Sequence, residues 1–308
     1  MSTITFTSAH LKKLLQLNFY NFSENKFMVF GIRGALPAGL EFSILKEAHT
    51  IEASEPNYLT PHCCIGIWNP TDGKIALFPG STVPNLKYIK KQQQGLARAN
   101  CMMSGYYSYY EKGFHYPRPE SAHKALRLAT NIALRRSTDD LNYSNTDPVE
   151  VGNPSDNIHA AYCNEINGGY SSAGCQVIVG QPKCAARGTN SENTAYWKSF
   201  YDIIYGQADQ LKFDYALFRF ADAEAVALYS AHPMQTRLRF GSKGNTVTSL
   251  QQKLTAAGYY HTSIDGDFGR NTLRAVLEYQ TAKFGLAEAD GVVGNKTGGG
   301  LGLVLPMI

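Results

Sequence analysis

Two short segments contain the side chains best suited to nucleophilic chemistry. Cys175 follows the small residues Ser172–Gly174, which predict a tight turn where backbone N–H groups can approach a developing oxyanion. His159 lies 16 positions before the cysteine, and a histidine beside a thiol can act as its base or form an imidazolium–thiolate pair. The apolar run Val177–Val179 predicts a strand that anchors the turn. The pattern therefore predicts cysteine-dependent acyl transfer.

Three further residues are candidates for binding a substrate. Asn157 lies two positions before His159, and His115 lies in the aromatic segment 114–117. His115 suits either the wall of a cleft or a purely structural role. Arg33 could hold a carboxylate through its bidentate fork, although an ordinary surface arginine is the alternative.

Other site classes lack their motifs in this sequence. There is no His-Glu-x-x-His, His-x-His, paired Cys-x-x-Cys, Gly-x-Ser-x-Gly or phosphate-binding loop, so neither a metal nor a cofactor is expected. A lone cysteine is most often a buried thiol, which is the expectation for the other five cysteines. These are Cys63, Cys64, Cys101, Cys163 and Cys184.

Hydrophobic periodicity and turn residues predict the elements that must position these side chains. A helix is expected at 8–18 with Ser8 as its N-cap, and the segment 120–136 suits either a helical stripe or, in part, a strand. The run 137–157, rich in Asp, Asn, Ser and Pro, is expected to be loop. The remaining expectations are strands at 27–32, 177–179 and 215–220, a hairpin at 64–78, and helices at 195–204 and 222–231.

Composition limits the class of protein. With 308 residues, 44% of them apolar, the chain can build roughly two domains around buried cores, and it is not a disordered chain. The net charge of +4 does not require a nucleic-acid partner. No window reaches the roughly 18 apolar residues of a membrane span. The N-terminal segment lacks the pattern of a secretory signal, so export by the general secretory route is not expected.

The last part of the chain contains a degenerate internal repeat. Asp-Gly-x-x-Gly-x-x-Thr occurs at 265–272 and again 25 positions later at 290–297, and each Asp-Gly pair predicts a turn. With the apolar spacing of Val247, Leu250 and Leu254, this segment closely resembles the three-helix peptidoglycan-binding domain. The run 298–301 departs from the usual ending of that family, so a frayed last helix is expected.

The segment 159–178 resembles the cysteine-dependent L,D-transpeptidase family, whose motif is a histidine followed by Ser-His-Gly-Cys. In that resemblance Cys175 is the nucleophile, His159 the general base, and Ser172 and Gly174 form the turn. The sequence departs from the motif at Ala160, Ala173 and Val177. The resemblances together imply an α+β chain: a β-rich catalytic domain at 1–235 and a small all-α peptidoglycan-binding domain at 236–308.

The two resemblances imply a peptidoglycan-modifying enzyme that cleaves stem peptides beside the terminal D-alanine through a thioester. Loss of the motif's Arg or Asn at Val177 favours hydrolysis over cross-linking or exchange. Wall chemistry without a secretory signal favours a delivered antibacterial toxin, such as a type VI secretion effector acting in a target cell's periplasm, with secretion machinery and an immunity protein as partners. The alternatives are a phage endolysin, a cross-linker of the producer's own wall and a non-catalytic wall-binding protein.

Overall fold

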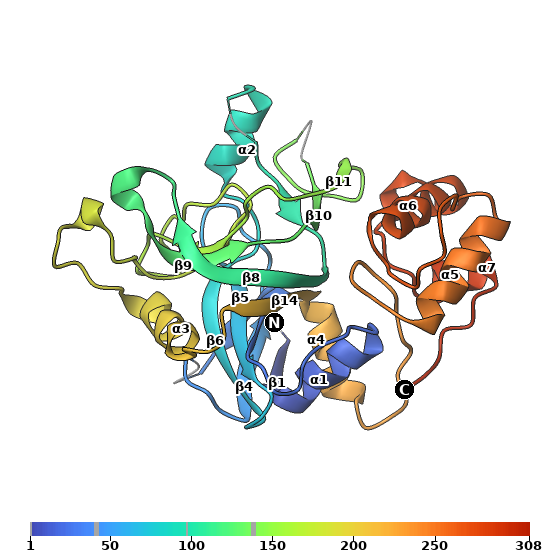
Figure 1. The fold of residues 1–308 in the computed structure, drawn as a ribbon, viewed down its shortest axis with the longest axis horizontal. Coiled ribbons are helices and arrows are strands. Elements are labelled where there is room, and N and C mark those ends of the chain that lie inside the picture. Colours follow the sequence, from blue (N-terminus) through green and yellow to red (C-terminus); the bar gives the residue numbers. More distant parts are fainter. Residues whose placement is uncertain (1, 40–42, 97, 137–139) are drawn as a thin grey trace.

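The computed structural model describes residues 2–39, 43–96, 98–136 and 140–308, and its central element is a closed β-barrel (Figure 1). The strand order around the barrel is β12-β13-β6-β5-β2-β14-β8-β9. These strands are β2 (Met28–Arg33), β5 (Cys63–Asn69), β6 (Lys74–Ser81), β8 (Gly105–His115), β9 (His123–Leu128), β12 (Ile158–Ala160), β13 (Gln176–Ile178) and β14 (Lys212–Arg219).

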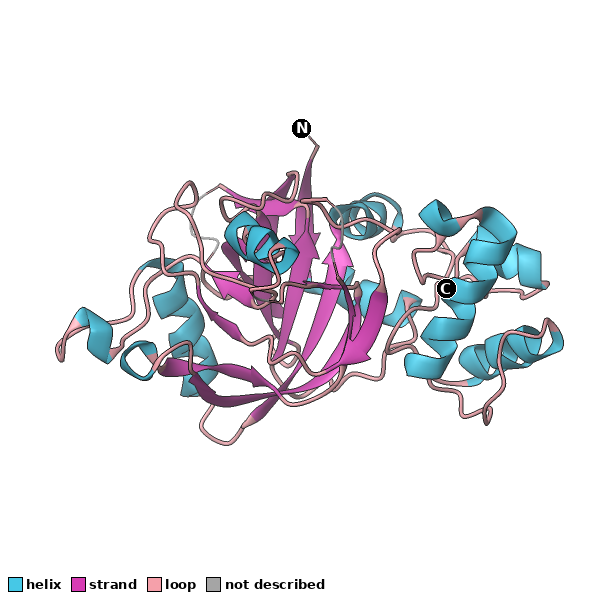
Figure 2. Ribbon diagram, turned by 90° about the horizontal axis from the view of Figure 1, so that it is seen from above, coloured by secondary structure: helices cyan, strands magenta, loops and turns pink. Residues whose placement is uncertain are grey.

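Two small sheets and several helices surround the barrel (Figure 2). One sheet has the order β1-β4-β3 and the other β11-β10-β7. Their strands are β1 (Thr3–Thr7), β3 (Ala35–Ala38), β4 (Ala48–Ala53), β7 (Cys101–Met102), β10 (Ile132–Arg135) and β11 (Val149–Gly152). The helices of this part are α1 (Ser8–Leu17), α2 (Leu86–Gln93), α3 (Ala195–Gly206) and α4 (Phe220–Tyr229), with short 3₁₀ turns at Pro119–Ser121 and Ala185–Arg187.

Burial explains why the barrel strands are so apolar. All seven residues of β5 are buried, because one face lines the barrel interior and the other is covered by neighbouring elements such as β3. Aromatic side chains fill the interior, with Phe78 packed edge-on against Phe200 of α3. All six cysteines are free thiols, as the sequence predicted. No helix among the described residues is long and apolar enough to cross a bilayer.

The structure corrects two expectations about local elements and decides between two alternatives at a third. Thr7, not Ser8, caps α1, because the Thr7 hydroxyl accepts a hydrogen bond from the His10 N–H at 3.1 Å. The segment 120–136, for which a helix and a strand were both possible, forms β9 and β10, which pair with β8 and β11. The expected loop 137–157 contains β11, whose Val149 and Val151 pack against the C-terminal helices. Residues 137–139 of that expected loop lie outside the described residues.

The C-terminal part contains three helices, as its resemblance implied: α5 (Asn245–Ala256), α6 (Arg270–Phe284) and α7 (Asn295–Leu301), with a 3₁₀ turn at Leu286–Glu288. The last helix forms in spite of its three glycines, so the expectation of a frayed ending is not met. Gly302 ends it in the left-handed conformation at φ 63°, and its N–H bonds the Gly298 and Gly299 carbonyls.

Each Asp-Gly turn of the repeat is organised around one buried glutamine. The Gln251 amide nitrogen lies 2.7 Å from Asp265 Oδ1 and 3.0 Å from Thr272 Oγ1, and its oxygen accepts the N–H of Gly266. The Gln280 amide makes the corresponding contacts in the second turn, with Asp290, Gly291 and Thr297. The repeat in the sequence therefore encodes two copies of one hydrogen-bond network.

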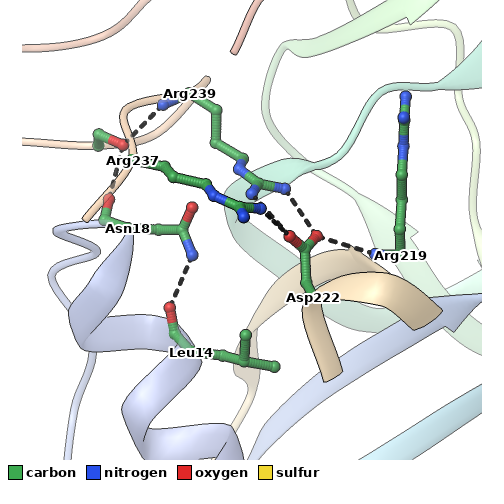
Figure 3. Close-up of polar contacts among 7 residues, drawn as sticks. Leu14, Asn18, Arg219, Asp222, Arg237 and Arg239 are labelled. Carbon is green, nitrogen blue, oxygen red and sulfur yellow. Dashed lines mark hydrogen bonds and ion pairs between the residues drawn. The ribbon is translucent and has the colours of Figure 1, made fainter. Parts of the chain in front are cut away.

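A buried ion-pair network joins the barrel domain to the C-terminal part (Figure 3). Asp222, at the third residue of α4, accepts hydrogen bonds from Arg237 at 2.8 Å and from Arg239 at 3.1 and 3.2 Å. Burial opposes ionisation of Asp222, but the two arginines outweigh it and lower its pKa to about 2. The Ser242 hydroxyl adds a bond to the Asn18 carbonyl at 2.6 Å. These contacts fix the chain as it leaves α4.

Candidate active site

The register of two parallel strands brings the predicted nucleophile and base together. His159 of β12 is level with Val177 of β13, and the Gln176 N–H donates to the Asn157 carbonyl at 2.9 Å. The same register places Cys175 level with Asn157. Because side chains alternate along a strand, Cys175 lies on the same face of the sheet as His159, at the level two residues before it. Two residues that are 16 positions apart in the sequence thus become neighbours in space.

A second histidine completes the cluster. His115, the last residue of β8, stacks on the His159 ring with centroids 3.9 Å apart and an angle of 12° between the planes. One ring nitrogen of each histidine and the Cys175 sulfur lie within 4.8 Å of one another. The sequence left His115 as either a residue of a cleft wall or a structural histidine, and in the structure its ring lies against that of His159.

Hydrogen bonds fix which nitrogen of each ring carries the proton. His159 Nδ1 lies 2.7 Å from the Ala160 carbonyl, which can only accept, so Nδ1 carries hydrogen and Nε2 has a free lone pair. Asn157 accepts the Leu128 N–H through Oδ1 at 3.1 Å, so its amide nitrogen donates to His115 Nδ1 at 3.0 Å. In its neutral form His115 therefore carries its proton on Nε2. Asn157 thus orients a ring of the cluster.

Burial keeps this cluster neutral at rest. The Cys175 side chain is only 8% exposed, and burial, followed by the nearby Asp156, raises the pKa of its thiol well above the ordinary range. Burial and the neighbouring histidines hold the pKa of His159 well below its usual value, and burial lowers that of His115 to about 4. Of the two alternatives from the sequence, these shifts favour a histidine that acts as a base over an imidazolium–thiolate pair at rest, because both charges of the pair would be desolvated.

The small residues before Cys175 form a closed turn. The Ser172 hydroxyl accepts the Gly174 N–H at 3.1 Å and donates to the Cys175 carbonyl at 2.7 Å. A Cβ on Gly174 would lie 2.7 Å from the Asp156 carboxylate oxygens, so glycine is required by packing. Since the Gly174 N–H is already bonded, it does not supply the free oxyanion donor that the turn predicted. The Cys175 N–H is the remaining candidate in this turn.

Three residues of the site had no clear signal in the sequence. Asp156 is buried beside Gly174 and accepts a hydrogen bond from Asn100, and burial raises its pKa to about 7. His123 packs edge-on against His159, with centroids 5.7 Å apart. Asn100 comes from a distant loop, so spacing could not reveal it. The pairing of His115 with His123 across β8 and β9 would have required knowledge of that hairpin.

Arg33 does not join this cluster. Its guanidinium donates to the Thr82 hydroxyl at 3.0 Å and to the Thr82 and Met102 carbonyls at 2.7 and 2.8 Å. It lines a separate cleft whose walls do not include Cys175, His159 or His115. A role for Arg33 in holding substrate beside the sulfur is therefore not supported by its position.

The donor chemistry of the cluster bears on metal binding. Two imidazoles and a thiol are ligands that zinc accepts. Here His115 presents Nε2–H, because Asn157 occupies Nδ1, and this ring would have to lose that proton or turn before it could ligate. The observed hydrogen bonds suit a proton acceptor at His159 and a proton donor at His115 better than a pair of metal ligands.

Comparison with known proteins identifies the C-terminal part. Residues 243–298 match the model of a family described as a peptidoglycan binding domain. The chain is also similar to the spore cortex-lytic enzyme of Bacillus subtilis (strain 168), with 38% identity over 85 residues, which is 28% of this chain and 26% of that protein. For the spore cortex-lytic enzyme of Halalkalibacterium halodurans, the identity is 44% over 57 residues, 18% of this chain and 17% of the relative. No solved structure matches.

These findings differ between the C-terminal part and the barrel. The C-terminal part is a peptidoglycan-binding domain, as the sequence predicted. The chain spans about a quarter or less of the length of the two curated relatives. The resemblance of 159–178 to L,D-transpeptidases therefore stays a prediction, and the barrel's chemistry must be argued from its own residues.

Proposed function

We propose that this protein is a peptidoglycan-directed cysteine enzyme that hydrolyses stem peptides. The observation that carries the proposal is the buried cluster of Cys175, His159 and His115, in a chain that also contains a peptidoglycan-binding domain. The similarity to two enzymes named as cortex-lytic supports action on peptidoglycan. The binding domain would hold the barrel at the wall and raise the local concentration of stem peptides.

In the proposed first step, the lone pair on His159 Nε2 accepts the thiol proton as the Cys175 sulfur attacks the carbonyl carbon of the third stem residue. The carbonyl oxygen gains negative charge, which the N–H of Cys175 and the Nε2–H of His115 can stabilise. The carbon–nitrogen bond then breaks, and His159 returns the proton to the departing amine of D-alanine. A thioester on Cys175 remains.

Water completes the proposed cycle. His159 accepts a proton from water as its oxygen attacks the thioester carbonyl, and the proton then returns to the departing sulfur. Hydrolysis is favoured over transfer to an amine because Val177, where the L,D-transpeptidase motif has Arg or Asn, is fully buried and apolar. The L,D-transpeptidase motif has a second histidine at the position of Ala173. In this chain, His115 supplies the second imidazole of the site.

Delivery to a rival cell is a further part of this proposal. A wall-directed hydrolase of this kind would act as a toxin when it is released into a target periplasm. Targeting the chain to the periplasm of a test bacterium should lyse or round the cells, and His159→Gln should remove that effect. Growth unaffected by the unmodified chain would argue against the toxin role without bearing on the enzymatic one.

The decisive experiment uses isolated peptidoglycan and disaccharide tetrapeptide as substrates, with product identification by mass spectrometry. The unmodified protein should release D-alanine or cleave cross-links, and Cys175→Ala should abolish this. Cys184→Ala is the matched control, since Cys184 is also a buried thiol at 7% exposure but lies outside the cluster. It should retain full activity.

Three other results would change the proposal. New stem-peptide dimers or exchanged D-amino acids would establish a transferase. Unchanged muropeptides, with both proteins still pelleting with the wall, would leave a binding protein without this chemistry. Activity that iodoacetamide spares and EDTA removes would favour a metal held by the same three side chains.

A further inference from the structure

A cleft of about 1330 Å³ lies apart from the Cys175 cluster, between the barrel and the peptidoglycan-binding domain. The barrel side contributes Arg33, Arg135 and Arg219, and the chain leading to the C-terminal helices contributes Arg237 and Arg239. Clefts between domains are common sites for ligands. Five arginines on one cleft indicate a ligand that carries negative charge.

Neutral oxygens hold two of these guanidinium groups in place. Arg33 bonds to the Thr82 hydroxyl and to two backbone carbonyls. Arg135, which is 7% exposed, bonds to the Asn145 and Asp147 carbonyls at 2.9 Å and to the Ala289 carbonyl at 2.8 Å. Carbonyl oxygens orient a guanidinium but do not cancel its charge. The two side chains are thus fixed in position by groups that leave their charge intact, and the carboxylates of Asp147 and Asp290 act on Arg135 from nearby.

The other arginines differ in how far their charge is compensated. Arg237 and Arg239 share the single carboxylate of Asp222. Arg219 is exposed and uses only its backbone N–H on Asp222, while its guanidinium extends away from that carboxylate (Figure 3). The buried Cys101 thiol lies in the field of Arg33, Arg135 and Arg219, each of which opposes the effect of burial on its pKa. These three side chains therefore share one region of the cleft.

The cleft also contains negative and aromatic groups. Four carboxylates, those of Glu52, Glu55, Asp222 and Asp290, line it together with Tyr58. A wall with five arginines and four carboxylates suits a peptide that carries several carboxylates and an amine. Bidentate pairing with arginine favours carboxylates or phosphates over a neutral glycan.

We propose that this cleft is a second binding site for the anionic stem peptide of peptidoglycan, with Arg33, Arg135 and Arg219 receiving its carboxylates. The inference rests on the proposed function for its choice of anion. A site between the two domains would hold one stem peptide of a wall strand while another enters the Cys175 cluster. Binding there would add to that of the C-terminal domain without taking part in bond cleavage.

The test measures binding of disaccharide tetrapeptide to the full chain by titration calorimetry, in a Cys175→Ala background so that no turnover occurs. Arg219→Glu changes an exposed side chain, and it should weaken binding about tenfold and reduce the salt dependence. Arg274→Glu is the matched control, because Arg274 is exposed on α6 outside the cleft. It should change binding less than about twofold.

Two further ligands identify the anion. The disaccharide without its peptide should be insensitive to Arg219→Glu, and inorganic phosphate should compete only weakly with the tetrapeptide. Equal effects of Arg219→Glu and Arg274→Glu, or phosphate binding as tight as that of the tetrapeptide, would overturn the inference. Cleavage is scored separately with Cys175 intact, so a chain that binds through Arg219 but does not cut would refute the proposed function and leave the anion site standing.

Discussion

The Cys175 cluster and the two glutamine-centred turns are both buried polar networks, but they are built over very different distances in the sequence. Gln251 reaches Thr272 across 21 positions, and Gln280 reaches Thr297 across 17. His115, His159 and Cys175 come from three segments that only the closed barrel brings together. The local networks leave a readable repeat in the sequence, whereas the long-range pairing that adds His115 to the site leaves no pattern of its own.

The two networks also differ in how completely they are satisfied. The glutamine amides have partners for both nitrogen and oxygen. Around the cluster, His123 Nε2 has no hydrogen-bond partner, and burial shifts the pKa values of the thiol, the two imidazoles and the nearby Asp156 away from their ordinary values. A fully satisfied network stabilises a fold, while perturbed titratable groups in one place are typical of catalysis. The predictions below test that contrast.

The largest effect is expected from the cluster's histidines. His159→Gln should lower the rate constant for stem-peptide cleavage by about 10²- to 10⁴-fold, because it removes the general base. His115→Gln should lower it by about tenfold or more through loss of a donor to the oxyanion. Steady-state kinetics on disaccharide tetrapeptide would measure both. His261→Gln, on an exposed residue of the C-terminal part, should have no effect, and equal rates for all three variants would remove His159 from the chemistry.

The same cluster predicts an unusual pH profile. Burial lowers the pKa of both histidines, to about 4 for His115, so the neutral base persists when the pH falls below the ordinary histidine value near 6.5. Cleavage rates should stay within about twofold between pH 7 and pH 5.5. An acid limb with a midpoint near 6.5, measured as kcat/KM against pH, would show that His159 is solvated in the working enzyme.

Asp222 should give the largest change in stability. Breaking a buried ion pair by removing one partner costs about 3–5 kcal/mol, so Asp222→Ala should lower the free energy of unfolding by that amount. Its folded pKa of about 2 lies below the unfolded value, so its contribution is full above about pH 4 and is lost as the pH falls towards 2. Asp202→Ala, which removes an exposed pair with Lys198, should cost less than about 1 kcal/mol in the same urea titration.

How far the sequence predicted the fold depended on whether the signal was local. The helical face of Leu11, Leu14 and Leu15 and the hairpin at 64–78 were predicted, because periodicity and an Asn-Pro-Thr-Asp-Gly turn mark them. The segment that forms β9 was ambiguous, because an alanine-rich segment fits both the helical and the strand period. The strand β11 was missed because so short a strand depends on pairing with β10. Barrel closure depends on strand order, which no local pattern encodes.

The candidate active site was also predicted only in part from the sequence. Cys175 and His159 were predicted as a pair because adjacent parallel strands turn a fixed spacing into proximity. Asp156 and Asn100 were not, since their roles come from packing against Gly174. The sequence left open whether His159 acts as a base or forms an imidazolium–thiolate pair, because desolvation depends on burial in the finished fold. Arg33 was predicted to bind a carboxylate without a location, because the cleft that it lines is built from segments far apart in the sequence.

Asp156 should make stability depend on pH in the opposite sense to Asp222. Its folded pKa is raised to about 7 by burial, so the protonated form is favoured in the fold. That contribution is full below about pH 4 and is lost as the pH rises through 7. Asp156→Asn should therefore gain stability relative to the unmodified protein as the pH rises from 5 to 8, by about 2–3 kcal/mol. A difference that does not vary with pH, in thermal melts across this range, would mean that Asp156 is ionised throughout.

The smallest and most selective effect compares the two turns directly. Gln251→Leu leaves the N–H groups of Asp265 and Gly266 without their acceptor, so it should destabilise the C-terminal domain by about 2–3 kcal/mol. Gln280→Leu removes the acceptor of one N–H, that of Gly291, and should cost about 1–2 kcal/mol. Hydrogen exchange across 243–298 would report both, with Gln252→Leu on the exposed face of α5 as the control.

Because the Cys175 cluster shares no hydrogen bond with these turns, cleavage of soluble disaccharide tetrapeptide should be unchanged while pelleting with isolated wall falls. If Gln251→Leu also abolished soluble cleavage, the two networks would be coupled through Asp222 and the linking arginines rather than independent.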